Sequence, residues 1–350
     1  MIRWMQSRAV DNDRQMFRPR EMAKRGCLCL LMVLGASGTM ATDGSELRLA
    51  SDSWPPFTDN PTGQRVAVEL VHTALERTGI KATTTVVDWK EVERGLRTST
   101  YDGSAAMWRN EQRERHLLFS EPYLENRLVL IGRKGSPVEG LHIVDLAGKR
   151  VAAVGHYAYG DEIKKADGVL FVNGRSDQDN LDKLLAGDVE YMLVDELVVR
   201  YLVASQPEEA ANRLELGTTV LARRLLHFSV RRKLPGAEDI IAAFNREIRE
   251  MMADGTYSEI LQVGWIRVDV DGDGLVELVA LGDRVGEMPP GTVYDVFGEV
   301  PEEAAIEKQR IFVQGNIYKG WDAIPDAYKG PTGIMDVGWK SGTTLGTLKF

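Results

Sequence analysis

Arg113 is the residue whose surroundings point most directly to binding chemistry. The apolar run 105–108 precedes it, a charged segment surrounds it, and residues 119–123 (Phe-Ser-Glu-Pro-Tyr) follow. A guanidinium group is planar and meets a carboxylate through two parallel hydrogen bonds. The pattern therefore predicts a site at a strand end that holds a small anion beside an aromatic wall without reacting with it. The alternative is a solvated charged helix, whose exposed ion pairs contribute little.

Residues 269–280 form a second segment with side chains that can bind a ligand. Gly274 stands at the sixth position, where a metal-binding loop turns sharply, and oxygen ligands stand at the odd positions around it. The candidate metal ligands are Asp269, Asp271, Asp273, the carbonyl oxygen of Leu275, and Glu277. Oxygens at this spacing suit calcium, which we expect in a structural role. Position 12 is Ala280, so the loop lacks the glutamate of an EF-hand and is similar to Asp-x-Asp-x-Asp-Gly calcium loops between strands. An acidic turn without metal is the alternative.

The elements that must position these residues alternate between strand and helix. Strand-like patterns cover residues 46–52, 83–87, 105–108, 128–131, 149–154, 191–194 and 224–230. Helical spacing covers residues 66–79, 91–98, 179–186 and 237–254. This alternation predicts an α/β protein whose parallel strands are covered by helices. Residues 282–350 contain short strand-like runs and predict a small β-rich appendage.

Several side chains lie just beyond predicted strand ends, where ligands bind in such sheets. Trp54, Phe57 and Trp108 fall in this position, and Asp195 ends the strand at 191–194. As alternatives, the tryptophans are core residues, and Asp195 caps a following helix.

The N-terminal segment 1–41 has the order of a secretory signal: a charged region, a short apolar run, then small residues. The apolar run is too short to span a membrane, and Met22 is an alternative start. Both cysteines, Cys27 and Cys29, lie in this segment. The mature chain would therefore have neither disulfides nor thiol chemistry.

The charge of the chain limits its partners. The 350 residues carry a net charge of −9, and without residues 1–41 there are 36 Lys and Arg against 49 Asp and Glu, a net charge of −13. An acidic surface repels nucleic acid and anionic lipid, so we expect neither as a partner. No later segment has the apolar length of a membrane span. We expect a soluble protein that is exported to the periplasm.

Five motifs appear in order along residues 46–265. They are Trp-Pro-Pro-Phe at 54–57, the Arg113 turn with 119–123, Leu-Ala-Gly-Lys-Arg-Val at 146–151, the segment 187–195, and the segment 245–257. This set resembles the family 3 extracellular solute-binding proteins of the amino-acid-binding type. The resemblance implies a two-lobed, type II periplasmic-binding-protein fold with two hinge crossovers, whose lobes close around the ligand. Lobe 1 would comprise 46–130 and 228–265, lobe 2 would comprise 131–227, and 266–350 would be a C-terminal extension.

The resemblance also implies roles for individual residues. Arg113 matches the arginine that clamps the ligand's α-carboxylate, and Asp195 matches the acid that receives its α-ammonium. Phe57 or Trp54 matches the aromatic ring that packs against the ligand.

Two departures from the family pattern add Trp108 and Tyr157 as candidate contacts. Trp108 stands where amino-acid binders usually carry a small hydroxyl residue. Residues 156–158 read His-Tyr-Ala, where a Gly-Thr-Thr-like loop is common. These replacements favour a larger or flatter solute.

The resemblance favours a monomeric, non-catalytic receptor that passes a small carboxylate or zwitterion to an ABC-type importer in the membrane. The first alternative is an enzyme, because some relatives resemble periplasmic cyclohexadienyl or arogenate dehydratases. Such an enzyme needs an acid over the departing hydroxyl. The cleft motifs offer no such acid with a proton-transfer partner, so we expect no enzyme. The second alternative is a ligand-sensing module that docks onto another protein through residues 282–350.

Overall fold

The computed structural model describes residues 46–59, 63, 65–280, 285, 293–298 and 309–329. The predicted signal peptide, including Met22, Cys27 and Cys29, lies outside the described residues. None of the helices in the described part of the chain combines the length and the apolar character that a bilayer span requires.

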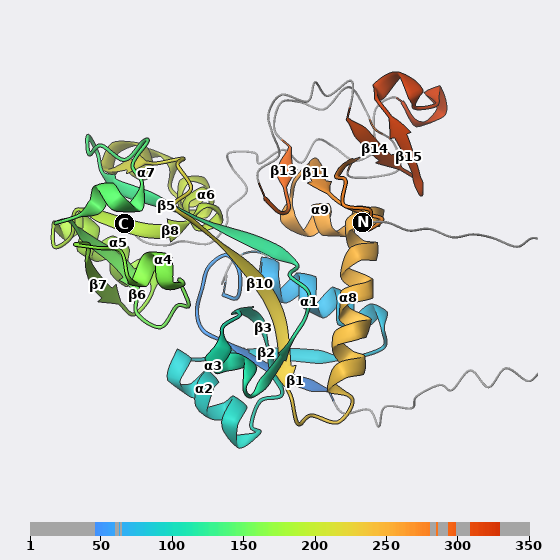
Figure 1. Cartoon of the computed structure of the whole chain (residues 1–350), viewed down its shortest axis with the longest axis horizontal. Helices are drawn as coiled ribbons and strands as arrows, with labels where there is room; N and C mark the ends of the chain where they lie inside the picture. Colours follow the sequence, from blue (N-terminus) through green and yellow to red (C-terminus); the bar gives the residue numbers. More distant parts are fainter. Residues whose placement is uncertain are drawn as a thin grey trace, which may run out of the picture. The chain divides into compact units, whose positions relative to one another are not determined.

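The first lobe is built on parallel strands with helices on their faces (Figure 1). β1 pairs in parallel with both β2 and β3, and α1 packs against β3 and α8. The elements of this lobe are β1 (Leu47–Ser51), α1 (Val66–Arg77), β2 (Ala82–Val86), α2 (Trp89–Thr98), β3 (Gly103–Trp108), α3 (Glu111–Glu114), β4 (Leu117–Phe119), α8 (Ala237–Asp254) and α9 (Thr256–Leu261).

The second lobe repeats this plan. β6 pairs in parallel with β7 and β8, and α5 packs against β6 and β8. The elements of this lobe are β6 (Arg150–Val154), α4 (Asp161–Lys164), β7 (Leu170–Gly174), α5 (Asp177–Ala186), β8 (Tyr191–Asp195), α6 (Glu196–Ser205), α7 (Pro207–Arg213) and β9 (Leu214–Leu216).

Two long strands, β5 (Leu124–Arg133) and β10 (Ala222–Arg231), connect the lobes (Figure 1). They pair antiparallel with each other; β10 also pairs with β3, and β5 also pairs with β8. The predicted two-lobed α/β fold with two crossovers is confirmed. The lobe boundaries predicted at residues 130 and 227 fall inside these strands, so each crossover strand serves both lobes.

β3 packs very closely against β10. A Cβ atom on Gly103 would lie 2.1 Å from the Ser229 carbonyl oxygen, so only glycine permits this approach. All six residues of β3 are buried, and the strand ends at Trp108. On the neighbouring α2, the side chain of Asp88 caps the helix by accepting a hydrogen bond from the Glu91 N–H, which fixes the helix start at Trp89.

The C-terminal appendage contains a separate sheet with strand order β13-β11-β12-β14-β15. Its strands are β11 (Trp265–Val268), β12 (Glu277–Ala280), β13 (Tyr294–Asp295), β14 (Arg310–Val313) and β15 (Asn316–Lys319). The prediction of a small β-rich appendage is therefore confirmed. β11 and β12 pair antiparallel on either side of the acidic loop, as the sequence pattern indicates.

The appendage contacts both crossover strands through Glu125 on β5. The Glu125 residue is 5% exposed. Its carboxylate accepts hydrogen bonds from Arg127 Nε (3.2 Å), Arg223 Nη1 (2.5 Å) and the Gly298 N–H (3.1 Å). Arg127 in turn donates to the backbone carbonyl of Asp295. One buried carboxylate thus joins β5, β10 and the appendage.

We expect the Glu125→Ala variant to lose about 3 kcal/mol of unfolding free energy, because Arg127 and Arg223 would lose the buried carboxylate that they share, and Arg127 would keep only its longer contact with Glu196. Chemical unfolding at neutral pH measures this loss. The matched control is Glu121→Ala, whose partner Arg249 is half exposed, as is Glu121 itself. The control should lose less than about 1 kcal/mol. Equal losses in the two variants would contradict the structural role of Glu125.

Candidate ligand-binding site

Arg113 is held by a short helix and by backbone carbonyls. The Asn110 side chain accepts a hydrogen bond from the Arg113 N–H (2.8 Å), so α3 starts directly after β3. The guanidinium donates from Nη1 to the Trp108 carbonyl (2.6 Å) and from Nη2 to the His156 carbonyl (3.4 Å). It also lies 4.4 Å from the centroid of the Trp89 ring. Because His156 belongs to the second lobe, Arg113 contacts both lobes.

The Arg113 guanidinium is largely enclosed, yet no ion pair among the described residues involves it. Burial lowers the pKa of Arg113 to about 10, and the negative charges of Asp52 and Glu93 only partly offset this effect. An enclosed cation without a counter-ion is unfavourable. An anion that reaches this guanidinium therefore gains a partner already fixed in position.

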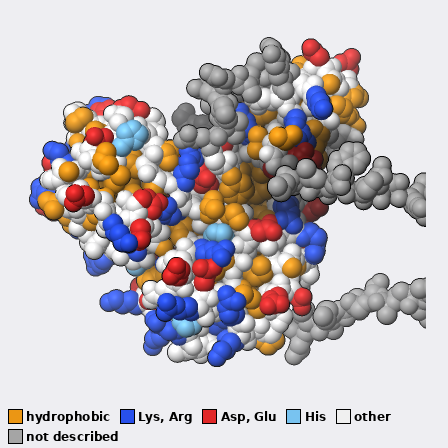
Figure 2. Space-filling model, in the orientation of Figure 1, with side chains coloured by type: hydrophobic (Ala, Val, Ile, Leu, Met, Phe, Trp, Pro, Cys, Tyr) orange, Lys and Arg blue, Asp and Glu red, His pale blue; other side chains and the backbone are white. Residues whose placement is uncertain are grey.

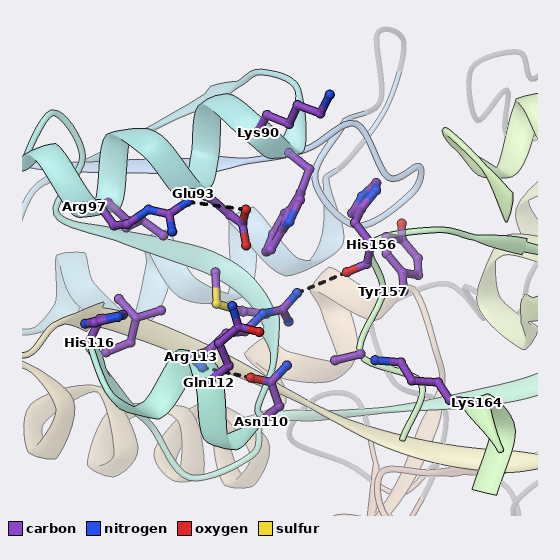
Figure 3. A pocket seen from close by; sticks show the side chains of 15 residues that line it. Lys90, Glu93, Arg97, Asn110, Gln112, Arg113, His116, His156, Tyr157 and Lys164 are labelled. Carbon is purple, nitrogen blue, oxygen red and sulfur yellow. Dashed lines mark hydrogen bonds and ion pairs between the residues drawn. The ribbon is translucent and has the colours of Figure 1, made fainter. Parts of the chain in front are cut away.

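A cavity of about 400 Å³ lies beside Arg113 (Figure 3). This volume suits a small organic ligand. α2 and residues 107–117 line it from the first lobe, and residues 156–158 with Lys164 on α4 line it from the second. The lining residues are Trp89, Lys90, Glu93, Leu96, Arg97, Met107, Asn110, Gln112, Arg113, His116, Leu117, His156, Tyr157, Ala158 and Lys164.

Three aromatic side chains pack together next to Arg113. The ring centroids of Trp54 and Trp108 are 5.5 Å apart, those of Trp54 and Tyr157 5.2 Å, and those of Trp108 and Tyr157 5.1 Å. Together with Asp52 and Arg113, these three side chains border a small extension of about 20 Å³. Such a volume holds about one water molecule, so the rings leave no space there for a solute.

Asp52 and His156 join the two lobes at the edge of the cavity. Asp52 follows β1 in the first lobe, and its Oδ2 lies 2.9 Å from Nε2 of His156, which follows β6 in the second. The Trp89 ring stacks on the His156 ring, with centroids 5.4 Å apart and planes at 13°. The lobes therefore meet through an ionisable pair and a ring stack beside the position for a ligand.

Asp195 ends β8 and caps α6. Its Oδ1 accepts a hydrogen bond from the Leu197 N–H (2.7 Å), and its buried Oδ2 has no hydrogen-bond partner among the described residues. Asp195 and Asp177 share a crevice with essentially no free volume. Trp54, Trp108, Leu128, Tyr157, Tyr159 and Val194 complete the wall of this crevice. Burial raises the pKa of both carboxyl groups to about 7.

Four of the residues predicted as ligand contacts lie next to the cavity. Arg113 and Tyr157 line the cavity itself, and Trp54 and Trp108 line its small extension. The two tryptophans are also almost fully buried, at 5% and 4% exposed. Trp54 and Trp108 are therefore both core residues and neighbours of the cavity.

The other two predicted contacts, Asp195 and Phe57, line neither the cavity nor its extension. Phe57 is fully buried, and its ring centroid lies 4.3 Å from that of Trp54. Asp195 caps α6, the alternative that its position in the sequence left open. The pairing of Arg113 and Asp195 around one ligand stays a prediction.

The sequence patterns did not reveal Trp89, Asp52 and His156 as parts of this site. Asp88 is a helix-capping residue type, and it places Trp89 in the first turn of a helix. That signal indicates where Trp89 lies along the chain. It gives no indication that the helix faces residues 156–158 of the other lobe.

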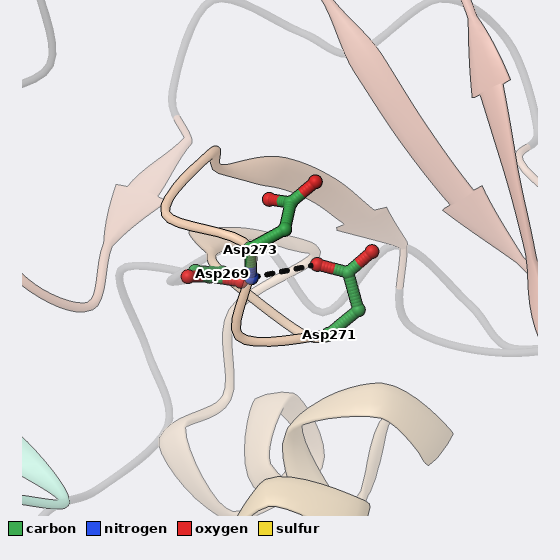
Figure 4. Close-up of side chains that lie close together, drawn as sticks. All are labelled: Asp269, Asp271 and Asp273. Carbon is green, nitrogen blue, oxygen red and sulfur yellow. Dashed lines mark hydrogen bonds between the residues drawn. The ribbon is translucent and has the colours of Figure 1, made fainter. Parts of the chain in front are cut away.

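The acidic loop converges as its spacing predicts. Carboxylate oxygens of Asp269, Asp271 and Asp273 lie within 4.8 Å of one another, and each residue also accepts a backbone hydrogen bond inside the loop (Figure 4). Arg310 on β14 reaches the same group. Its Nη1 lies 2.7 Å from Asp273 Oδ2, its Nη2 lies 3.3 Å from Asp271 Oδ2, and its Nε lies 2.7 Å from Glu277 Oε1.

The oxygen atoms of this loop suit a hard cation in their chemistry, but the Arg310 guanidinium already neutralises them. A calcium ion held by Asp271, Asp273 and Glu277, with the Leu275 carbonyl, would have to displace Arg310. Calcium binding at this loop therefore stays a prediction. The ion would compete with the Arg310 guanidinium for the same carboxylates.

We expect the unfolding free energy to fall as pH rises from about 4 to 7. The folded-state pKa of Asp177 and Asp195 is about 7, above the usual unfolded value near 3.9, so the folded protein retains protons that the unfolded chain releases. Each group contributes at most about 1.4 kcal/mol per pH unit. Chemical unfolding of the Asp177→Asn, Asp195→Asn double variant should show a flatter pH profile. The exposed Asp167→Asn control should follow the wild type, and parallel profiles for all three would contradict the assignment.

We expect the Arg310→Gln variant to gain more stability from calcium than the wild type gains. Removing the guanidinium leaves the carboxylates of Asp271, Asp273 and Glu277 without their cation. Calcium at ten times its dissociation constant would then add about 1.4 kcal/mol. Thermal unfolding with calcium and with a chelator measures the effect. A wild-type gain as large as that of the variant would show that Arg310 does not compete with the ion.

Comparisons with known proteins agree with this architecture. A family model for bacterial extracellular solute-binding proteins, family 3, matches residues 47–266. No curated protein matches the chain significantly.

Solved structures are similar to the chain over about three fifths of its length. The arginine-bound form of truncated ArgBP from T. maritima is 25% identical with a TM-score of 0.50, covering 60% of this chain and 97% of that chain. The GluR0 ligand-binding core from Nostoc punctiforme, in complex with L-glutamate, is 17% identical with a TM-score of 0.52 (62% and 97% covered). The BvgS VFT2 domain from Bordetella pertussis is 19% identical with a TM-score of 0.54 (63% and 93% covered).

The two lobes, the paired crossovers and the family match over residues 47–266 lead to one conclusion: the chain belongs to family 3 of the bacterial extracellular solute-binding proteins.

Proposed function

We propose that this solute-binding protein captures a small organic acid or amino-acid-like anion on Arg113 and delivers it to an ABC-type importer. Solute binding follows from the family, and the ligand class and the importer are the proposed parts. The arginine and the glutamate held by the similar structures support a small ligand with a carboxylate group. The predicted signal peptide supports a periplasmic location.

The observation that carries this proposal is the guanidinium of Arg113. It borders a cavity of about 400 Å³ and donates hydrogen bonds to a backbone carbonyl group from each lobe. No carboxylate of the described residues pairs with it. A carboxylate ligand would supply the missing counter-ion and would strengthen the contact between the lobes. Ligand capture would thus be linked to lobe closure.

A dehydratase on this fold is less favoured, because the acids near the cavity already have partners. Glu93 lies 3.7 Å from Arg97, and Asp52 is bonded to His156. Asp177 and Asp195 have the pKa of a general acid at neutral pH, but they lie in the closed crevice. Turnover of prephenate or arogenate by the purified protein would favour the enzyme instead.

We expect the Arg113→Ala variant to bind its carboxylate ligand at least about 30-fold more weakly than the wild type, a loss of about 2 kcal/mol. The reason is that the anion loses its paired hydrogen bonds inside an enclosed site. A thermal-shift screen of amino acids, opines and dicarboxylates selects the ligand, and calorimetry measures its affinity. Arg115→Ala is the matched control, since Arg115 is exposed and lies outside the cavity lining. Unchanged affinity in the Arg113 variant would refute the proposal.

A further inference from the structure

The lining of the cavity is cationic although the chain as a whole is acidic. Lys90, Arg97, Arg113 and Lys164 line the cavity, against a single carboxylate from Glu93. The full chain carries a net charge of −9. Figure 2 shows Lys and Arg side chains gathered over the region of α2 and α3, among fewer acidic ones. A concentration of positive charge at one site on an acidic protein attracts anions to that site.

Three of these four cations have no carboxylate partner among the described residues. Arg97 pairs with Glu93 at 3.7 Å, whereas Lys90, Arg113 and Lys164 form no ion pair there. The three come from different elements: α2, α3 and α4. In Figure 3, Lys90 and Lys164 lie on different sides of the cavity, with Arg113 between them in this view. A ligand that satisfies all three needs more than one negative group.

The cavity offers no free carboxylate for an ammonium group. Asp195 lies in the crevice, outside the cavity lining. Asp52 borders only the small extension, where it is bonded to His156. Glu93, the one carboxylate that lines the cavity, is already paired with Arg97 at 3.7 Å. A zwitterion placed on Arg113 would therefore add an ammonium to a lining that already holds four cations and offers it no unpaired carboxylate. This arrangement favours anions without an ammonium group.

The rest of the lining is flat or apolar. Trp89 and Tyr157 present aromatic rings, and Leu96, Met107 and Leu117 supply aliphatic surface. The Trp89 ring also contacts the Arg113 guanidinium and the His156 ring. A ligand body that packs against such walls is itself flat or apolar.

We propose that the cavity selects an organic dianion: a flat or apolar body with two separated acid groups, one on Arg113 and the other near the lysines of the two lobes. This inference rests on the proposed capture of an anion by Arg113 and names the class of that anion. The second charge is the feature that distinguishes this ligand from an amino acid.

Calorimetry on the full mature chain tests the inference with matched pairs of acids. The pairs are terephthalate and benzoate, naphthalene-2,6-dicarboxylate and 2-naphthoate, and glutarate and butyrate, with phenylalanine and arginine as zwitterionic probes. At least one dicarboxylate should bind about tenfold or more tightly than its monoacid, and its affinity should fall more steeply with added salt. Any monoacid or zwitterion that binds as tightly as every dicarboxylate would overturn the inference.

Variants separate this inference from the proposed function. The Lys90→Gln, Lys164→Gln double variant should lose the preference for the dicarboxylate but keep its affinity for the monoacid. Lys81→Gln and Lys165→Gln are the matched controls, because both lysines are exposed and lie outside the cavity lining. An unchanged preference in the double variant would overturn the inference. If amino acids bind most tightly and their binding is lost in Arg113→Ala, the dianion inference is wrong and the proposed function stands. If no carboxylate binds, or if binding survives Arg113→Ala, the proposed function fails with it.

Discussion

The need to balance the enclosed charge of Arg113 governs the rest of this site. Its guanidinium is held by carbonyl groups and by the Trp89 ring, which fix its position without cancelling its charge. Burial makes that charge unfavourable, as the lowered pKa of Arg113 indicates. A cation fixed in this way is ready for an anion, because the cost of positioning it is already met by the fold. The opening of the cavity beside Arg113 gives an anion access to it.

Three aromatic side chains lie between the cavity and Asp195. Trp54, Trp108 and Tyr157 pack with their ring centroids 5.1–5.5 Å apart and separate the cavity beside Arg113 from the crevice that holds Asp195. Family relatives that bind amino acids usually have small hydroxyl residues in this region. Trp108 and Tyr157 stand in such positions here, and their rings fill the space around Asp195. The residue types at these positions therefore change the shape of the site.

The appendage adds a constraint on the crossover strands. Glu125 accepts hydrogen bonds from β5, from β10 and from Gly298, so the hinge region and the C-terminal sheet share one buried carboxylate. In the acidic loop, Arg310 pairs with Asp271 and Asp273, two of the residues that the sequence pattern predicts as metal ligands. Both contacts use arginine to satisfy clustered carboxylates. The Glu125 contact joins the appendage to the crossover strands, whereas the Arg310 contact lies within the appendage.

The sequence by itself indicated the family and most of the longer elements, but not β7, α4, α6 or α7. Period-2 and period-3.6 patterns and short motifs depend on neighbours within a few positions. It also predicted Arg113 as a ligand contact from the residue types around it, and the structure places Arg113 in the lining of the cavity. Only the tertiary structure showed that Trp89 and His156 stack across the lobes, that aromatic rings enclose Asp195, and that Arg310 reaches the acidic loop. These contacts join residues tens of positions apart. Which distant side chain fills a space or supplies a charge depends on how the elements pack, and no local pattern encodes that.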